Sequence, residues 1–342
     1  MFYYIFALGT ILLSFLVTRL VQEFALHNKI VDLPDQARKK HEHPVPLLGG
    51  IGIFISLAVA LYGGRVIILS GNLEPRHWYG VLIGAFIIVI GGIIDDIKKL
   101  KPIQQFCFAV AAVIAVVIGG VGIAKVTDPY GGLFYLSSWM IPVFSMLWIL
   151  GMMYTTKLLD GVDGLVSSVG AVGGIVIFLF TSTTRWLQPD IAFAALMFSS
   201  ACLGFLLLNW PPAKIFLGES GSLLVGFVLG VLSIISGGKI AIALLIMGIP
   251  ILDVAWTIVR RIFAKQNPFK TADRKHLHFR LLDAGLGQRT TVILYASVSL
   301  LFGLSTLFLQ SRGKFLSLIV LGSLMALLII VVNWLDRRAK LR

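Results

Sequence analysis

The chain has 342 residues, of which 58% are hydrophobic and 13% are charged, and its mean hydropathy is +0.93. These values exclude an ordinary soluble domain, because a soluble fold needs more polar surface than this composition supplies. The formal net charge is +13, but the basic residues are dispersed among loops between apolar segments, which argues against a nucleic-acid partner. The composition therefore predicts a membrane protein.

Eleven apolar segments follow one another along the chain, and each is close to the roughly 20 residues that cross a bilayer. They cover residues 1–22, 46–69, 79–96, 103–120, 139–159, 164–184, 190–209, 220–237, 239–262, 289–311 and 314–335. The first has no basic stretch before it and no small-residue cleavage site, so we interpret it as a retained helix. The sequence thus predicts one all-α polytopic membrane domain over 1–342, with about eleven transmembrane helices.

Basic residues divide unevenly between the two sets of loops that these spans define. One set contains 22 of the 29 lysines and arginines. Because cytoplasmic loops retain positive charge, we predict an outer N-terminus and a cytoplasmic C-terminus. The longest outer connection, 121–138, contains VGIAKV, a DPYGG turn and LFYL, which predicts a small external β-hairpin. Cys107 and Cys202 lie within apolar spans and are expected to be buried thiols.

Asp95 and Asp96, in GGIIDDIKKLKP, end the third predicted span on the cytoplasmic side. The C-terminus of a helix carries negative partial charge, and adjacent carboxylates repel each other. A bound divalent cation, or a proton to be transferred, would relieve both penalties. The alternative interpretation is a solvated loop with local ion pairs.

Asp160 and Asp163, in LLDGVDGL, follow the fifth span. The glycines permit a tight turn and close approach of a ligand. Two carboxylates three residues apart can face a ribose, a base edge or a metal together. A sharp turn without a ligand also explains this segment.

Glu219 and Ser220, in FLGESGSL, begin the eighth span. An acidic first turn and a hydroxyl group satisfy the free N–H groups of any helix start. The same geometry binds phosphate, and the carboxylate can hold a magnesium ion that bridges it. The segment by itself leaves both interpretations open.

His276, His278 and Arg280, in HLHFR, lie in a predicted cytoplasmic loop. A His-x-His pair can bind zinc, but no further Cys or His lies at ligand spacing. We therefore interpret these side chains as donors to a phosphate or a sugar.

The ninth span contains two further features. Pro250 is expected to bend it, because proline removes a hydrogen bond from the helix interior. Asp253 lies in its inner part and is expected to be buried and paired with Arg260 or Arg261.

Together, six segments resemble the polyprenyl-phosphate N-acetylhexosamine-1-phosphate transferase family over nearly the whole chain. They are KHEHPVPLLGG, GGIIDDIKKLKP, LLDGVDGL, NWPPAKIFLGESGSL, PILDVAWTIVRR and HLHFRLL. Members of the family transfer a sugar 1-phosphate from a UDP-sugar to a polyprenyl phosphate and release UMP. The His-x-His-x-Arg-Leu-Leu pattern is similar to the branch that transfers GlcNAc 1-phosphate to undecaprenyl phosphate. It is less similar to the phospho-MurNAc-pentapeptide translocase branch, which remains the alternative.

The resemblance also implies a setting and a set of roles. It implies a bacterial cytoplasmic membrane, an active site on the cytoplasmic face, Mg²⁺ (or Mn²⁺) as cofactor, and a homodimer as one oligomeric state. It implies catalytic roles for Asp95 and Asp96 in activating or positioning the lipid phosphate. It implies substrate binding by Lys40, Asp160, Asp163, Asn209 and Phe216, and metal binding by Glu219. From the residues themselves, we also expect substrate binding by Lys157, His276, His278 and Arg280, and metal binding by Asp160.

Three departures from the family pattern are visible. Glu219 stands where the family has Asp, Tyr154 and Lys157 stand at the two positions of Asn-x-x-Asn, and Phe279 replaces a third histidine. Glu keeps the charge of Asp but displaces it by about one methylene. Lys157 introduces a cation near the expected phosphates, where it can neutralise charge that a metal otherwise shares.

Two other classes of protein remain as alternatives. A transporter places its substrate site near the midplane, on broken helices and symmetric repeats. Most spans here lack ionisable residues at mid-depth, and no repeat is visible. A non-catalytic scaffold would explain the departures from the motifs.

Overall fold

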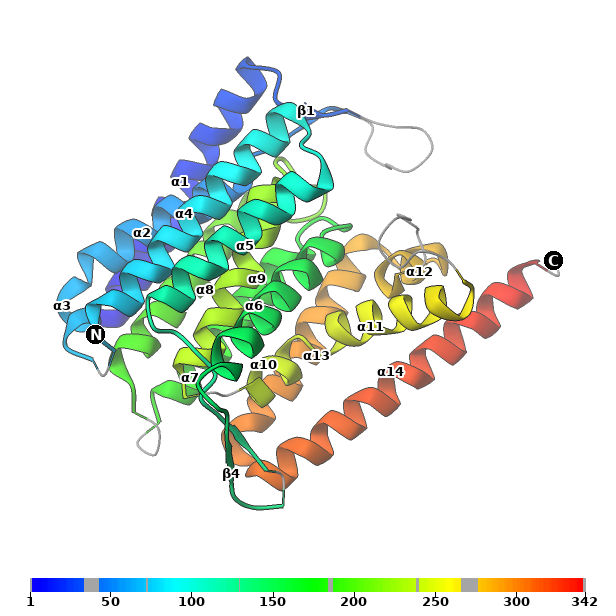
Figure 1. The fold of residues 1–342 in the computed structure, drawn as a ribbon. Coiled ribbons are helices and arrows are strands. Elements are labelled where there is room, and N and C mark those ends of the chain that lie inside the picture. The colour runs from blue at the N-terminus through cyan, green and yellow to red at the C-terminus, as the bar shows by residue number, and fades with distance from the viewer. Residues whose placement is uncertain are drawn as a thin grey trace.

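The computed structural model describes residues 2–33, 43–71, 73–128, 130–183, 187–237, 240–265 and 276–340, so Lys40 lies outside the described residues. The fold is mostly helical (Figure 1). The helices are α1 (Phe2–His27), α2 (Gly49–Gly63), α3 (Arg65–Leu69), α4 (Pro75–Lys98), α5 (Pro102–Ile118), α6 (Met140–Leu159), α7 (Leu165–Thr181), α8 (Pro189–Asn209), α9 (Gly218–Ile235), α10 (Ile240–Ile246), α11 (Gly248–Phe263), α12 (Leu277–Asp283), α13 (Gln288–Phe308) and α14 (Ser311–Lys340). Two short antiparallel pairs complete it, β1 (Val31–Asp32) with β2 (Val45–Pro46) and β3 (Lys125–Thr127) with β4 (Leu133–Tyr135).

Every predicted span coincides with one of these helices or with two consecutive ones. Among the described residues, seven helices are long and apolar enough to cross a membrane, namely α1, α4, α6, α8, α9, α13 and α14. The consecutive pair α10 and α11 forms an eighth candidate. Helices α2, α5 and α7 are apolar but shorter, at 15, 17 and 17 residues. The chain is therefore a multi-span membrane protein.

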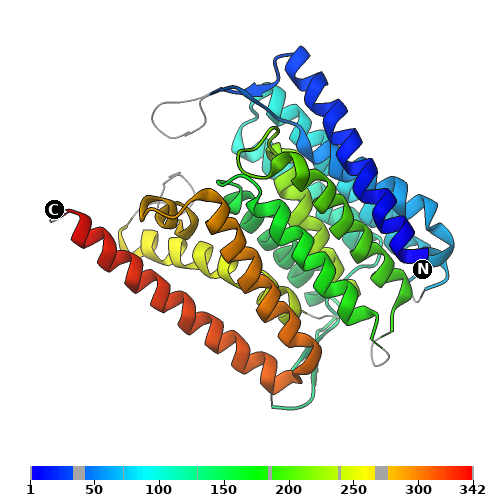
Figure 2. The same cartoon turned by 180° about the vertical axis from the view of Figure 1, so that it is seen from behind.

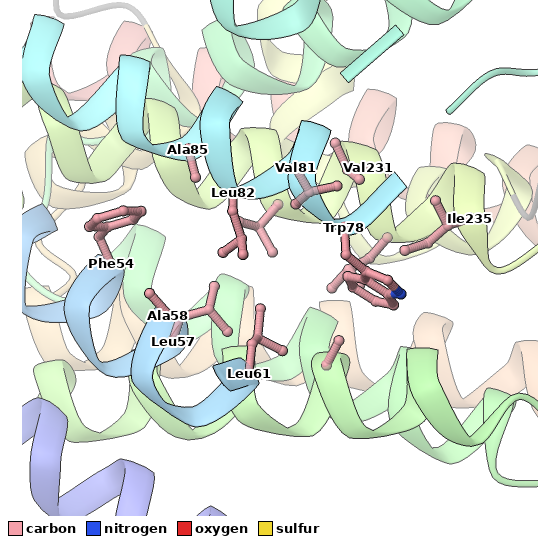
Figure 3. Close-up of a pocket in the computed structure, with 13 residues that line it drawn as sticks. Phe54, Leu57, Ala58, Leu61, Trp78, Val81, Leu82, Ala85, Val231 and Ile235 are labelled. Atoms are coloured by element: carbon pink, nitrogen blue, oxygen red, sulfur yellow. The ribbon is translucent and has the colours of Figure 1, made fainter. Parts of the chain in front are cut away.

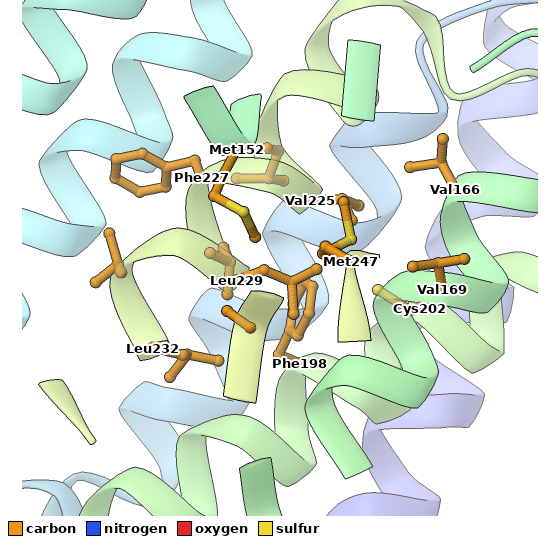
Figure 4. Packing of buried hydrophobic residues seen from close by; sticks show 14 of the residues in the cluster. Met152, Val166, Val169, Phe198, Cys202, Val225, Phe227, Leu229, Leu232 and Met247 are labelled. Carbon is orange, nitrogen blue, oxygen red and sulfur yellow. The ribbon is translucent and has the colours of Figure 1, made fainter. Parts of the chain in front are cut away.

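Figures 1 and 2 show α1 to α9 as a closely packed bundle, with α10 to α14 beside it and α14 outermost. Large apolar side chains gather between the helices of the bundle, among them Phe198, Phe227 and Met152 (Figure 4). Others face outward, such as Leu8, Ile83 and Ile330. The hydrocarbon of a membrane keeps such side chains away from water as well as a protein core does, so a membrane protein can have an apolar exterior.

The ninth predicted span is broken, as the position of Pro250 indicates. Helices α10 and α11 meet at an angle of 81°. Pro250 is the third residue of α11, where its missing N–H has no intrahelical partner to lose. The bend lets α11 leave the direction of the bundle (Figure 1).

The cysteines agree only in part with the prediction. Cys202 is buried in α8, whereas Cys107 is exposed. The expectation for Cys107 was wrong because α5 packs against α4 and α6 and leaves its remaining face outward. Both thiols are free.

Glycines let the start of α9 approach α2 and α4 closely. A Cβ atom on Gly50 would overlap the backbone of Gly221, and a Cβ atom on Gly92 would overlap the backbone of Ser220. The N–H groups of Gly49 and Gly50 donate to the carbonyls of Phe216 and Leu217, at 3.0 Å each. Small residues permit this backbone contact in a membrane bundle. They hold the first turn of α9 beside the last turns of α4.

We expect Gly92→Ala to destabilise the protein, because the added methyl group has only backbone to displace. Overpacking of this kind costs roughly 1–3 kcal/mol. Gly151→Ala is the matched control, since Gly151 is also helical and an added Cβ atom there would have nothing within 4 Å. Thermal unfolding in detergent should show a lower midpoint for Gly92→Ala alone. Equal midpoints for the two variants would contradict this packing.

Candidate active site

Four helix ends meet at one end of the bundle, and they bring together the acidic residues that the sequence singles out. Asp95 closes the last turns of α4, where its Oδ1 accepts hydrogen bonds from the N–H of Leu100, at 2.7 Å, and from Nε2 of Gln105, at 2.8 Å. Gln105 belongs to the first turn of α5. The Asp95 carboxylate therefore fixes the turn between α4 and α5.

Asp96 contacts the start of α9. Its Oδ1 accepts a hydrogen bond from the N–H of Glu219, at 3.0 Å. The other oxygen, Oδ2, is buried and has no hydrogen-bond partner in the part of the chain that the structure describes. It lies against Gly218, whose φ is +69°. A buried carboxylate oxygen without a partner is costly, so this atom is a candidate contact for a ligand or a proton.

Lys157 lies at the fourth helix end, that of α6, and connects it to α9 and α5. It lies in the last turn of α6, and its ammonium group forms an ion pair with Oε1 of Glu219. The same Nζ donates to Oε1 of Gln105, at 2.8 Å. A continuous chain of contacts thus runs from Asp95 through Gln105 and Lys157 to Glu219, and from the N–H of Glu219 to Asp96.

Asp160 follows α6 directly and is exposed. Displacement of water by the surrounding protein, and then the charges of Glu219, Asp96 and Asp163, raises the pKa of Asp160 to about 8. A cation bound beside Asp160 would offset the negative charges of these neighbours and would lower the pKa of Asp160. A cation beside Asp160 would therefore release a proton near neutral pH. We call Asp95, Asp96, Asp160 and Glu219 the acidic cluster.

Asp163 and Asn209 attach the DGVDG turn to the segment before α9. Oδ2 of Asp163 accepts from the N–H of Ala213, at 3.0 Å. Oδ1 of Asn209 accepts from the N–H of Gly164 and from Oγ of Ser167, both at 3.0 Å. Nδ2 of Asn209 donates to the carbonyl of Ile215, at 2.9 Å. Asn209 is buried, so its observed contacts are within the protein.

Asp253 is buried in α11 and paired, as predicted. Its Oδ2 lies 2.8 Å from Nδ1 of His276, and its Oδ1 accepts from the N–H of Leu277, at 2.9 Å. The expectation named Arg260 or Arg261 as the partner. It missed these contacts because α12 returns to α11 from 23 residues further along the chain.

His278 packs directly on the DGVDG turn. A Cβ atom on Gly161 would lie 2.7 Å from Nε2 of His278, so a residue larger than glycine does not fit there. Both ring nitrogens are buried without a hydrogen-bond partner among the described residues. Burial, partly offset by Asp253 and reinforced by His276, lowers the pKa of His278 to about 3. His278 is thus a neutral imidazole at ordinary pH.

The structure therefore gathers most of the predicted residues, in two groups. Asp95, Asp96, Lys157, Asp160 and Glu219 form one group, and the loop with His276 and His278 adjoins it at Gly161. Phe216 and Arg280, half-buried, lie next to these groups in the chain: Phe216 is three residues before Glu219, and Arg280 is two after His278.

Gln105 was missed by the sequence analysis. Its side chain forms hydrogen bonds with both Asp95 and Lys157. A polar residue in the first turn of a helix is common, so the sequence did not single it out. A short connection between α4 and α5 was the available signal, because it brings the first turn of α5 close to the last turn of α4.

A metal ion would have oxygen donors here but no complete ligand set. Within the described ranges, no group of three or more His, Cys, Asp or Glu side chains converges as metal ligands do. Mg²⁺ commonly takes one or two carboxylates and completes its shell with water and substrate phosphates. The acidic cluster fits that pattern, and the unpartnered Oδ2 of Asp96 adds an oxygen beside it.

A separate apolar crevice lies between α2, α4, α8 and α9 (Figure 3). Trp78, Val81 and Ala85 of α4 contribute to its wall, together with Leu57 and Leu61 of α2. From residue 85 to residue 95, α4 rises about 15 Å, so the crevice is distant from the acidic cluster. Its lining is entirely apolar and supplies no group for chemistry.

The chain is thus a multi-span bundle with a charged site at one end, and the comparisons with known proteins give the class to which it belongs. Residues 78–237 match the model of glycosyl transferase family 4. The probable undecaprenyl-phosphate N-acetylglucosaminyl 1-phosphate transferase of Bacillus subtilis is 31% identical over 95% of this chain and 89% of its own length. The undecaprenyl-phosphate alpha-N-acetylglucosaminyl 1-phosphate transferase of Thermotoga maritima is 31% identical over 86% of each chain.

A relative from the other branch is also similar. The phospho-N-acetylmuramoyl-pentapeptide-transferase of Desulforamulus reducens is 30% identical over 76% of this chain and 80% of its own. The family resemblance drawn from the motifs is thus confirmed. The chain belongs to glycosyl transferase family 4.

Proposed function

We propose that this protein transfers GlcNAc 1-phosphate from UDP-GlcNAc to undecaprenyl phosphate and releases UMP. The acidic cluster with Lys157, at one end of a membrane bundle, is the observation that carries the proposal. A water-soluble nucleotide sugar and a membrane lipid can meet only at such an end. Two relatives that match 95% and 86% of this chain are named undecaprenyl-phosphate N-acetylglucosaminyl 1-phosphate transferases, which supports the sugar phosphate and the lipid acceptor.

In the reaction, an oxygen of the lipid phosphate forms a bond to the phosphorus that carries the sugar. The bond from that phosphorus to the oxygen of UMP breaks, and UMP leaves. Several negative charges approach one another, so positioning and positive charge supply most of the catalysis. Asp96 and Asp95 orient the attacking phosphate or accept its proton. His276, His278 and Arg280, with Asp163, Asn209, Phe216 and Lys40, belong to the donor side.

Magnesium, or manganese in its place, is the cofactor that we propose for this site. Glu219 and Asp160 would hold it, and when bound it would neutralise charge on the donor diphosphate. Burial raises the pKa of Asp160 most, and the charges of Glu219, Asp96 and Asp163 raise it further. A cation held by Glu219 and Asp160 would offset those charges, which supports this assignment. Binding of the ion would then release a proton from Asp160 near neutral pH.

The test of this function uses purified protein, undecaprenyl phosphate, magnesium and a panel of UDP-sugars. We expect UMP release and a lipid product whose mass has increased by one GlcNAc phosphate. Phospho-MurNAc-pentapeptide transfer, to which the Desulforamulus reducens relative points, would appear as product from the UDP-MurNAc-pentapeptide member of the panel. Absence of UMP release with every donor would reject an enzyme and favour the scaffold or transporter.

We propose that α2, α5 and α7 cross the membrane with the eight longer candidates, which gives eleven spans with a cytoplasmic C-terminus. The 22 basic residues on one set of loops support this orientation. The acidic cluster would then face the cytoplasm of a bacterial cell, and the β3–β4 hairpin would lie outside.

The orientation gives a prediction for Lys270. A cysteine placed at position 270 should react with a membrane-impermeant thiol reagent only after the membrane is opened. A cysteine at position 131, in the β3–β4 connection, should react in intact cells and provides the matched control. Labelling of position 270 from outside would overturn the orientation.

A further inference from the structure

Lys157 lies next to Glu219, which the proposed function makes a ligand of the metal ion. Its ammonium group contacts Oε1 of Glu219, and both side chains are largely shielded, with 25% and 15% of their side-chain areas exposed. An ammonium group has three N–H donors. Among the described residues, Glu219 and Gln105 accept hydrogen bonds from two of them, and the centroid of the Tyr154 ring lies 5.7 Å from Nζ. The third N–H is the one from which an oxygen of a ligand can accept a hydrogen bond.

The two charges are placed where their helices stabilise them. Lys157 lies in the last turn of α6, where the partial charge is negative. Glu219 lies in the first turn of α9, where the partial charge is positive. The pair therefore bridges two helix ends, and Gln105 at the start of α5 holds the ammonium group from a third direction. Such a fixed cation needs little reorganisation when negative charge arrives.

The surroundings of the pair are strongly acidic. Asp96 is bonded to the N–H of Glu219, and Asp160 interacts with the charges of both Glu219 and Asp96. A cation at this point thus offsets the repulsion that the cluster would exert on a diphosphate. Lys157 supplies a positive charge there from the chain itself.

We propose that Lys157 is a resident cation of the transfer site, which neutralises Glu219 and donates to the diphosphate of the bound donor. The divalent ion and the Lys157 ammonium group then compete for Glu219, so the wild type binds the ion more weakly than a variant without Lys157. Because Lys157 itself neutralises charge at the site, the turnover of the wild type also depends less on the ion. This inference rests on the proposed function for its diphosphate ligand. The competition at Glu219 is a property of the protein alone.

The first experiment measures Mn²⁺ binding to purified protein without substrates, by electron paramagnetic resonance. We expect Lys157→Met to bind Mn²⁺ about tenfold or more tightly than the wild type, because Glu219 loses its competing partner. The double variant Lys157→Met/Glu219→Gln should lose that gain. Lys98→Met, which removes an exposed lysine from the same end of the bundle, should bind as the wild type does.

The second experiment titrates Mg²⁺ in the UMP-release assay. Lowering free Mg²⁺ from millimolar to micromolar should cost the wild type at most about tenfold in turnover and Lys157→Met about 100-fold. Millimolar Mg²⁺ should partly restore Lys157→Met. Lys157→Arg, which keeps the positive charge, should depend on Mg²⁺ less than Lys157→Met does. Lys157→Asn is a second neutral variant if methionine prevents folding.

Unchanged Mn²⁺ affinity in the neutral variants would overturn the inference, and so would an unchanged Mg²⁺ response. Lys157 would then be an ion-pair partner of Glu219 with no part in the reaction. A wild-type protein that released no UMP at any Mg²⁺ concentration would instead reject the proposed function. In that case, the Mn²⁺ measurement would still test whether Lys157 and a divalent ion compete for Glu219.

Discussion

Asp95→Asn and Asp96→Asn are each expected to lower the turnover of sugar-phosphate transfer by about 100-fold or more. Asparagine keeps an oxygen that can accept the hydrogen bonds of Leu100 and Gln105, or of the Glu219 N–H. The fold should therefore persist, and loss of one of two adjacent negative charges should not destabilise the helix end. The variants remove the charge and the proton acceptor while leaving the geometry nearly intact.

Turnover and thermal unfolding should be measured on the same detergent preparations of these two variants. Asp128→Asn is the matched control, because Asp128 lies in the connection between β3 and β4, far along the chain from the acidic cluster. It should transfer sugar phosphate at the rate of the wild type. If both cluster variants did so as well, neither aspartate would be catalytic.

The second large effect is expected for Gly218→Ala, which should reduce turnover by about 100-fold or more. Gly218 has a φ of +69°, and an added Cβ atom would overlap Oδ2 of Asp96. The methyl group would displace the Asp96 carboxylate, which in turn holds the N–H of Glu219. The carboxylates of Asp96 and Glu219, which both take part in the proposed reaction, would therefore be displaced together.

Gly285→Ala is the matched control for Gly218→Ala, because it has the same cost of placing alanine at a positive φ without a contact with the acidic cluster. Gly285 has a φ of +96°, and a Cβ atom added to it would meet nothing within 4 Å. Both variants should lose about 1–2 kcal/mol of stability from the unfavourable backbone conformation. Gly285→Ala alone should retain turnover, measured with saturating substrates. Equal turnover of the two variants would show that the contact between Gly218 and Asp96 does not matter for the reaction.

Much of this protein follows from properties that are local in the sequence. The length and apolarity of each segment predict a helix that crosses or enters the membrane, because hydrocarbon cannot satisfy free backbone groups. The motifs at the ends of those segments point to Asp95, Asp96, Asp160 and Glu219 without knowledge of any contact. Pro250 likewise predicts the break that separates α10 from α11.

Tertiary structure decided which of these groups touch. Lys157 and Glu219 are 62 residues apart in the chain, and they meet because Gly226 and Gly230 let α9 approach α6 closely. Gln105 joins the site only because α5 begins beside the end of α4. Contacts of this kind depend on the packing of several helices at once, and no single segment encodes them. The sequence alone therefore determined the membrane bundle and its acidic end, whereas packing determined that Glu219 pairs with an ammonium group.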